Sequence, residues 1–207
     1  MNREAQLREL QIRMHACRLC LDAGYEIYPH AVAQGHVDAQ MMTIGQAPGI
    51  TEQDVGRPFN ASSGRTLFKW LAGAGIDEDW FRTTQYMTSV TKCYPGRQRS
   101  GSGDRVPTRA EQKLCRPFLD TELALIRPKL IVPIGRLAIE LFYPKKLKLT
   151  EIIGTEKVVD GCWVIPLPHP SGASRWPNIP ANAKLIEQAV AHIRVRADVL
   201  FPTRPRD

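Results

Sequence analysis

The sequence contains no apolar run that approaches the roughly 18 consecutive residues needed to span a membrane. Its opening stretch, MNREAQLREL, is rich in charge and lacks the apolar core of a secretory signal peptide. No internal repeat and no domain linker are visible along the chain. These absences exclude a membrane-spanning or repeat protein. They predict a cytoplasmic protein with one domain over residues 1–200 and a disordered tail over residues 201–207.

The composition is that of an ordinary globular protein with a basic surplus. Hydrophobic residues make up 43% of the 207 positions and charged residues 24%, which allows a substantial core. The net charge is +7 and the isoelectric point is near 9.3, which suits an anionic partner, nucleic acid first. Charge alone does not establish such a partner, because many basic proteins bind no polyanion.

Short apolar runs alternate along the chain with segments of helical periodicity. The run KLIVPI at residues 129–134 is apolar almost throughout, as expected for a parallel strand buried on both faces. Such alternation is typical of a three-layer α/β fold. We expect helices over residues 3–16, 62–74, 108–126, 136–142 and 181–195, and strands over residues 41–44, 81–90, 129–134, 156–159 and 162–166.

The segment Gly45–Phe59, GQAPGITEQDVGRPF, follows the first strand and is the most informative stretch of the chain. Ligands of open α/β sheets bind beyond the carboxyl ends of such strands, and the glycines would let a ligand approach the backbone. The segment carries the polar residues Gln46, Glu52 and Asp54. An ordinary connection between a strand and a helix is the alternative, but a long loop without regular structure favours function.

Four of the five cysteines form a pattern that suggests a metal site. Cys17 and Cys20 form a C-x-x-C pair. Cys93 lies in the segment TKCYPG and Cys115 in the segment CRPFL. Four thiolates can close a tetrahedral zinc site or hold one [4Fe–4S] cluster, and their spacing does not choose between the two. Cys162 lies in an apolar run and is expected to be a small core residue.

His169 follows the last predicted strand and lies between two prolines, before Ser171, Arg175 and Trp176. A single histidine is more often structural than catalytic, but its place at a strand end resembles that of the Gly45 segment. The stretch GRQRSGSGDRV at residues 96–106 has the composition of a flexible loop. Its arginines could lie on phosphates, and a solvated insertion is an equal alternative.

These motifs together resemble those of the family 4, Fe–S uracil-DNA glycosylases, over residues 14–190 or so. The family carries a first motif similar to GQAPGITEQDVGRPF and a second motif, H-P-[SA], that is followed by arginine. Its cysteines lie in three further motifs, C-x-x-C, K-C-x-P-x-G and C-R-P-F/Y-L. The resemblance implies a three-layer α/β/α sandwich with a central, mainly parallel four-stranded sheet. It also implies a monomer that excises uracil from DNA by base flipping, with a [4Fe–4S] cluster on Cys17, Cys20, Cys93 and Cys115.

The resemblance further implies roles for individual residues. His169 would donate to uracil O2 as charge grows on the leaving base, and Phe59 would stack on that base. Gln46 and Glu52 would complete the catalytic set. The remaining implied contacts are to the base, from Gly45, Ala47, Asp54 and Ser89, and to the DNA, from Ser171, Arg175 and Trp176.

Two departures from the family bear on the chemistry. Gln46 replaces a glutamate and can orient a water but not act as a base, so Glu52 or Asp54 becomes the candidate for that role. Ser89 replaces the asparagine that reads the uracil edge, and its single hydroxyl weakens discrimination between bases. The substrate is therefore DNA containing uracil or another deaminated base. A catalytically weak or inactive Fe–S nucleic-acid-binding member of the fold is the alternative.

Overall fold

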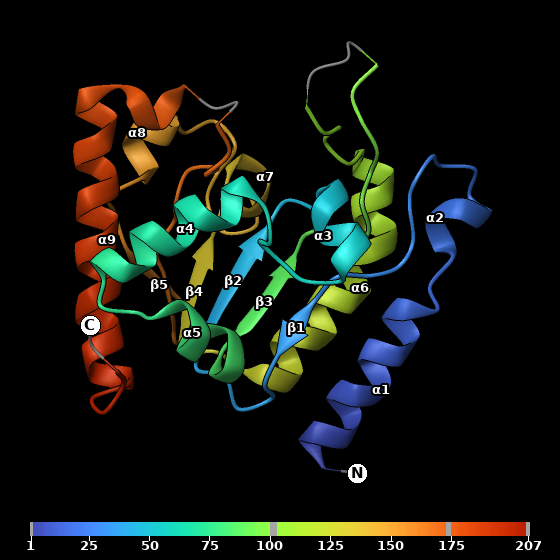
Figure 1. Cartoon of the computed structure of the whole chain (residues 1–207), viewed down its shortest axis with the longest axis horizontal. Coiled ribbons are helices and arrows are strands. Elements are labelled where there is room, and N and C mark those ends of the chain that lie inside the picture. The colour runs from blue at the N-terminus through green and yellow to red at the C-terminus, as the bar shows by residue number, and fades with distance from the viewer. Residues whose placement is uncertain (1, 100–102, 173–174, 206–207) are drawn as a thin grey trace.

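The computed structural model describes residues 2–99, 103–172 and 175–205, and contains one mixed sheet (Figure 1). Its six strands run in the order β1-β3-β2-β4-β6-β5. The four central strands are mutually parallel, and β1 and β5 pair antiparallel at the two edges. The expected four-stranded sheet is therefore correct for its parallel centre, while the two short edge strands extend it. The strands are β1 Gln34–Gly35, β2 Met41–Gly45, β3 Tyr86–Ser89, β4 Leu130–Pro133, β5 Lys157–Val159 and β6 Cys162–Val164.

Helices cover both faces of the sheet, which confirms the three-layer architecture (Figure 1). Alternate residues of β2 point to opposite faces, so that Met41 joins one apolar cluster and Met42 the other. The first cluster also contains residues of α4 (Ser62–Gly73) and α9 (Pro180–Leu200), and the second those of α1 (Arg3–His15) and α6 (Arg109–Ile126). The remaining helices are α2 Leu19–Asp22, α3 Ile50–Val55, α5 Glu78–Thr84, α7 Arg136–Ile139, α8 Leu149–Ile152 and the 3-10 turn η1 Trp176–Asn178.

Two segments differ from the sequence-based expectation. The segment after β2 is not a continuous loop, because α3 forms within it and ends at Gly56 in a left-handed conformation. Residues 78–84, part of which were expected in a strand, form α5 because Asp77 caps it by accepting from the Trp80 N–H. Thr83 and Thr84 donate to carbonyls one turn earlier, which satisfies their hydroxyls inside the helix.

The C-terminal residues were expected to be disordered, but the described part of this segment is packed. Phe201 and Arg204 are both buried, and the Arg204 guanidinium donates to the carbonyls of Ala74 and Gly75 and to Asp198. Residues 206 and 207 of the expected tail lie outside the described residues. Within the described ranges no helix is long and apolar enough to cross a membrane.

The carboxyl ends of the parallel strands meet at one edge of the sheet. Gly45, the last residue of β2, pairs in register with Ser89, the last residue of β3. Beyond β6 the chain runs on beside β4, where Leu167 bridges to Ile134, and it reaches His169 two residues later. Three segments that are far apart in the sequence therefore deliver their polar residues to the same place.

Candidate active site

A pocket of about 840 Å³, including its open mouth, lies at this edge of the sheet. Most of the predicted site residues line it, namely Gly45, Gln46, Ala47, Glu52, Phe59, Ser89, His169 and Ser171. Val32, Ser62, Asp104 and Ile134 also line the pocket and were not anticipated.

Gly45 forms the floor between the two residues expected to hold a base. A Cβ atom at this position would lie 3.1 Å from Cζ of Phe59 and 3.3 Å from Oγ of Ser89. Any larger residue would displace the ring or the hydroxyl. The glycine therefore allows Phe59 and Ser89 to approach the same point from two sides.

Phe59 is held by its backbone rather than by its ring alone. Its φ of 50° lies in the left-handed region, which a bulky residue rarely adopts without support. The buried guanidinium of Arg82 donates to the carbonyls of Pro58 and Phe59 over 2.9 and 2.8 Å, and it pairs with Glu78 at 2.7 Å. A Cβ at Gly64 would lie 1.9 Å from the Phe59 carbonyl oxygen, so this position requires glycine.

His169 is half-buried and its ring is fixed at one nitrogen. The backbone N–H of Ser171 donates to Nδ1 over 3.2 Å, and the Ser171 hydroxyl lies 2.9 Å from the same atom. Because Nδ1 accepts, the neutral imidazole carries its proton on Nε2. Burial lowers the pKa of His169, against an opposing effect of Asp104 and Glu52, which favours the neutral form. The site thus presents a neutral imidazole with one N–H donor.

Two carboxylates flank Gly49 on the wall of the pocket. Glu52 is buried, and its Oε2 accepts from the Gly49 N–H over 3.1 Å. A Cβ at Gly49 would lie 2.7 Å from Oε2 of Glu52 and 3.1 Å from Oδ2 of Asp104, so both oxygens lie against the same backbone. Asp104 also accepts from the Tyr94 hydroxyl through Oδ1 over 3.1 Å. Asp104 was missed because its segment has the composition of a flexible loop.

The segment that carries Asp104 is anchored to α6, at least in its described residues. The Arg105 guanidinium forms two 2.7 Å hydrogen bonds to Glu111 and donates to the Pro95 and Glu26 carbonyls. Burial alone would raise the pKa of Glu111, but the bonds from Arg105 and Thr108 lower it to about 2. Arg105 is therefore a structural anchor and not the phosphate contact that the loop composition allowed. Residues 100–102 of the predicted flexible loop lie outside the described residues.

Three predicted site residues do not line the pocket. Asp54 is exposed on α3 and is not among the lining residues, so the structure does not support it as a base contact. Trp176 is partly buried and packs against the first apolar cluster, and its backbone carbonyl accepts from Asn182 over 3.0 Å. Arg175 is exposed beside it, as a side chain that reaches toward DNA must be.

The four predicted cysteine ligands line a second cavity, together with apolar side chains such as Met14, Ile27 and Phe118. Burial and then the neighbouring thiol of Cys115 raise the pKa of Cys93 to about 12 and that of Cys20 to about 11. Within the described ranges, no three His, Cys, Asp or Glu side chains converge closely enough to hold a single ion. The four thiols nevertheless line one cavity, although they come from segments far apart in the sequence.

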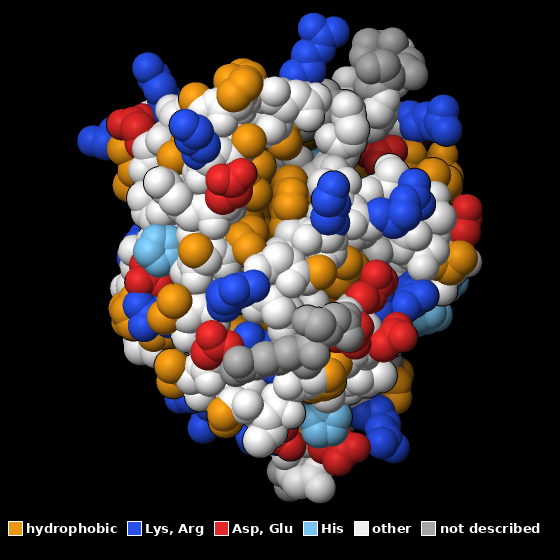
Figure 2. All heavy atoms as spheres, turned by 60° about the vertical axis from the view of Figure 1, so that its left-hand side comes forward, with side chains coloured by type: hydrophobic (Ala, Val, Ile, Leu, Met, Phe, Trp, Pro, Cys, Tyr) orange, Lys and Arg blue, Asp and Glu red, His pale blue; other side chains and the backbone are white. Residues whose placement is uncertain are grey.

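On the face of the molecule drawn in Figure 2, basic side chains lie among acidic ones. Figure 2 shows lysine and arginine side chains interspersed with acidic ones on one face, around a hollow with an apolar lining. No continuous stripe of basic side chains is visible among the described residues on this face.

Comparison with known proteins gives one consistent family. Residues 32–194 match the model of the uracil DNA glycosylase superfamily. The type-4 uracil-DNA glycosylase of Thermotoga maritima is 34% identical over 142 residues, which cover 68% of this chain and 69% of that protein. The type-4 uracil-DNA glycosylase of Sulfurisphaera tokodaii is 28% identical, with 91% of this chain and 82% of that protein covered. A type-5 uracil-DNA glycosylase of Pyrobaculum aerophilum is 30% identical over about half of each chain.

Proposed function

The chain belongs to the uracil DNA glycosylase superfamily, and we propose that it is a DNA-repair enzyme that hydrolyses the N-glycosidic bond of uracil in DNA. The observation that carries this proposal is the convergence of Phe59, Ser89 and His169 around the floor made by Gly45. These residues supply an aromatic face, an edge contact and a donor in one pocket. That combination suits a planar base that leaves as an anion.

The target base must leave the helical stack before it can enter this pocket. In the proposed complex, the ring of Phe59 stacks on the base and the hydroxyl of Ser89 meets its edge. Gly45 provides the space between them, because a side chain there would occupy the place of the base. The backbone of Ala47 closes the same wall.

His169 has the form needed to stabilise the leaving base. Negative charge builds on uracil O2 as the bond between C1′ and N1 breaks and its electron pair stays with the base. The neutral imidazole donates from Nε2 to that oxygen, while Ser171 keeps Nδ1 as the acceptor. A donor held in place before the reaction costs no reorganisation when charge develops.

The water that attacks C1′ needs a polar partner and an acceptor for its proton. Gln46 can orient this water but cannot take the proton. Glu52 and Asp104 are the two carboxylates on the pocket wall, and their negative charge would also stabilise the cationic sugar. We assign the proton to this pair rather than to Asp54, which is exposed outside the pocket.

The DNA contacts follow from the same edge of the molecule. Ser171 lines the pocket mouth, and Arg175 lies exposed a few residues further along. We propose that Arg175 fills the gap that the flipped nucleotide leaves in the duplex.

The cysteine cavity would hold a [4Fe–4S] cluster with Cys17, Cys20, Cys93 and Cys115 as ligands. When bound, the cluster would supply covalent cross-links between separate parts of the chain and no chemistry at the base. Cys17 and Cys20 follow α1, Cys93 follows β3, and Cys115 lies within α6. The cytoplasmic location and the monomeric state expected from the sequence stay predictions.

A catalytically weak or inactive nucleic-acid-binding protein of the same fold is the second candidate, favoured by Gln46 and Ser89. An assay of base release from single- and double-stranded DNA containing uracil, hypoxanthine or xanthine separates the two. The proposed enzyme leaves abasic sites that alkali cleaves. Tight DNA binding without release of any of the three bases would establish the second candidate instead.

A further inference from the structure

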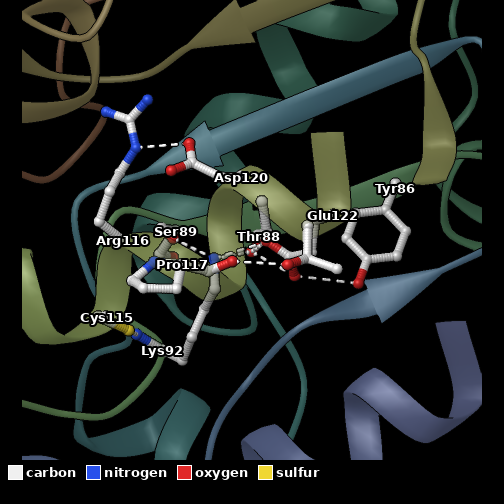
Figure 3. A network of polar contacts seen from close by, with 10 residues as sticks. Tyr86, Thr88, Ser89, Lys92, Cys115, Arg116, Pro117, Asp120 and Glu122 are labelled. Carbon is white, nitrogen blue, oxygen red and sulfur yellow. Dashed lines mark hydrogen bonds and ion pairs between the residues drawn. The ribbon is translucent and has the colours of Figure 1, made fainter. Parts of the chain in front are cut away.

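A lysine and a glutamate form a buried ion pair next to the pocket (Figure 3). The side chains of Lys92 and Glu122 are 2% and 0% exposed, and Nζ of Lys92 lies 2.7 Å from Oε2 of Glu122. Two charges taken out of water cost free energy that their mutual attraction often fails to recover. Apolar residues would fill the same space at no such cost, so stability alone does not account for the pair.

The pair forms hydrogen bonds to residues of β3, including Ser89 at its end. Nζ of Lys92 donates to the Ser89 carbonyl over 2.6 Å and to Oγ1 of Thr88 over 2.7 Å. Glu122 in turn accepts from the hydroxyls of Thr88 and Tyr86, each over 3.0 Å. Figure 3 shows Tyr86, Thr88, Lys92 and Glu122 meeting in one network. The Ser89 hydroxyl lies against Gly45, and both residues line the pocket.

The backbone of Lys92 makes two further contacts of the same kind. Its carbonyl accepts from the N–H of Val32 over 2.7 Å, and Val32 lines the pocket. Its N–H donates to Sγ of Cys115 over 3.3 Å, and Cys115 lines the cysteine cavity. Lys92 thus makes hydrogen bonds to two residues that line the base pocket, Ser89 and Val32, and to one that lines the cysteine cavity, Cys115.

We propose that Lys92, held in place by Glu122, is a positioning residue that fixes Ser89 against the target base and so contributes to base selection. The proposal rests on the proposed function, because it concerns the same pocket. Ser89 has one hydroxyl, so the direction of its backbone decides which edge of a base it meets. A charged donor on the Ser89 carbonyl restrains that direction, although Lys92 itself does not touch the base.

The test uses the double substitution Lys92→Met with Glu122→Gln. Removal of either charge alone would leave the other buried without a partner and destabilise the fold. The double variant carries neither charge, and the amide oxygen introduced by Glu122→Gln can still accept from Tyr86 and Thr88. The loss is therefore the Nζ donor that Lys92 supplies to the end of β3. Tyr86→Phe is the matched control, because it removes a buried hydrogen bond to Glu122 and leaves the Lys92 contact with Ser89 intact.

Three measurements are made on each protein: iron content, the uracil excision rate in a single turnover, and affinity for uracil-containing DNA relative to the same DNA with thymine. The double variant should keep its iron and its affinity for thymine DNA. Its excision rate and its preference for uracil DNA should each fall roughly ten-fold, as expected for loss of one charged hydrogen bond. Tyr86→Phe should change both by less than about two-fold.

Unchanged uracil preference in the double variant would overturn the proposal, as would an equal loss in Tyr86→Phe, which would indicate a role in packing only. The binding ratio needs no hydrolysis, so it separates the two proposals. A wild-type protein that prefers uracil DNA but releases no base would refute the enzymatic function. The role of Lys92 would then be decided by the binding ratio of the double variant. A wild-type protein without that preference would refute base selection at Ser89.

Discussion

The backbone N–H of Ser171 points at Nδ1 of His169 over 3.2 Å, and this single contact determines what the histidine can do. An N–H group can donate only to a nitrogen that carries no proton. The ring must therefore carry its proton on Nε2 while the contact persists. A second proton, on Nδ1, would place an N–H of the ring opposite the N–H of Ser171, which is unfavourable. This agrees with the lowered pKa of His169 in its half-buried site.

His169→Ala should lower the single-turnover rate of uracil release by roughly 10²–10³, the usual loss of one donor to a developing oxyanion. Affinity for uracil DNA should change much less, because the charge that His169 meets arises only in the transition state. Ser171→Ala separates the two contacts to Nδ1, since it removes the hydroxyl and keeps the backbone N–H that fixes the ring. A rate for His169→Ala close to that of the wild type would remove His169 from the mechanism.

The pH dependence of the same reaction should carry the signature of His169. Its pKa is lowered from 6.5, so the ring is more than half neutral at pH 6.5 and loses its neutral form only in more acidic solution. The rate should therefore be level at neutral and alkaline pH and fall as the pH drops through the lowered pKa. His169→Asn should lack this acidic decline, and a decline of equal midpoint in that variant would assign it to another group.

Two isosteric substitutions can separate the contributions of Glu52 and Asp104 to the reaction. Asp104→Asn and Glu52→Gln each remove one negative charge from the pocket wall and keep the shape of the side chain. We expect Asp104→Asn to lower the rate roughly 10²-fold, within the usual range for a lost acid–base group, with little change in stability. Glu52→Gln should also loosen the turn at Gly49, because Glu52 accepts its N–H.

Asp54→Asn serves as the control for both, because Asp54 is exposed outside the pocket and its charge should not matter to the reaction. Full activity in Asp104→Asn would return the role to Glu52 alone. Melting temperatures measured beside the rates separate a lost chemical group from a weakened turn.

The sequence predicts the parallel centre of the sheet because that part of the fold is set by local patterns. Strand β4 is an unbroken apolar run, and Thr108 with Glu111 makes the capping box that begins α6. Strand β5 matches the strand expected over residues 156–159, whereas β1 has only two residues and is too short to leave such a pattern. Helix α5 was missed because its threonines favour strands until their hydroxyls find carbonyls within the helix.

The family motifs named most of the residues that line the pocket, including Ser89 and His169 on separate segments as well as Gly45, Gln46 and Phe59. A residue outside those motifs, such as Asp104, could not be found in this way. Asp104 is held at the pocket by the Tyr94 hydroxyl and by its neighbour Arg105, which is bound to Glu111 on α6. Trp176 lies near His169 in sequence, yet it packs against the first apolar cluster and does not line the pocket.

The cysteine site predicts a coloured protein. With a [4Fe–4S] cluster, the purified protein should be brown, absorb broadly near 400 nm and contain about four irons per chain. Cys93→Ala should lose iron and stability together, because α1, β3 and α6 would no longer be tied. Cys162→Ala is the control, since Cys162 lies on β6 and is not among the residues that line the cavity. A colourless protein with one zinc ion would contradict the cluster.

The two departures from the family motifs give the sharpest test of base selection. Ser89→Asn replaces one hydroxyl by an amide that offers both a donor and an acceptor, and it should raise the ratio of uracil to hypoxanthine release. A paired polar contact discriminates by about 1–3 kcal/mol, so a change of roughly ten-fold is expected. Gln46→Glu restores an acceptor for the proton of the attacking water and should keep or raise the rate on uracil. Rates on matched oligonucleotides with uracil, hypoxanthine or xanthine measure both effects. A wild-type protein inactive on all three, which neither substitution restores, would show that the pocket binds DNA without catalysing hydrolysis.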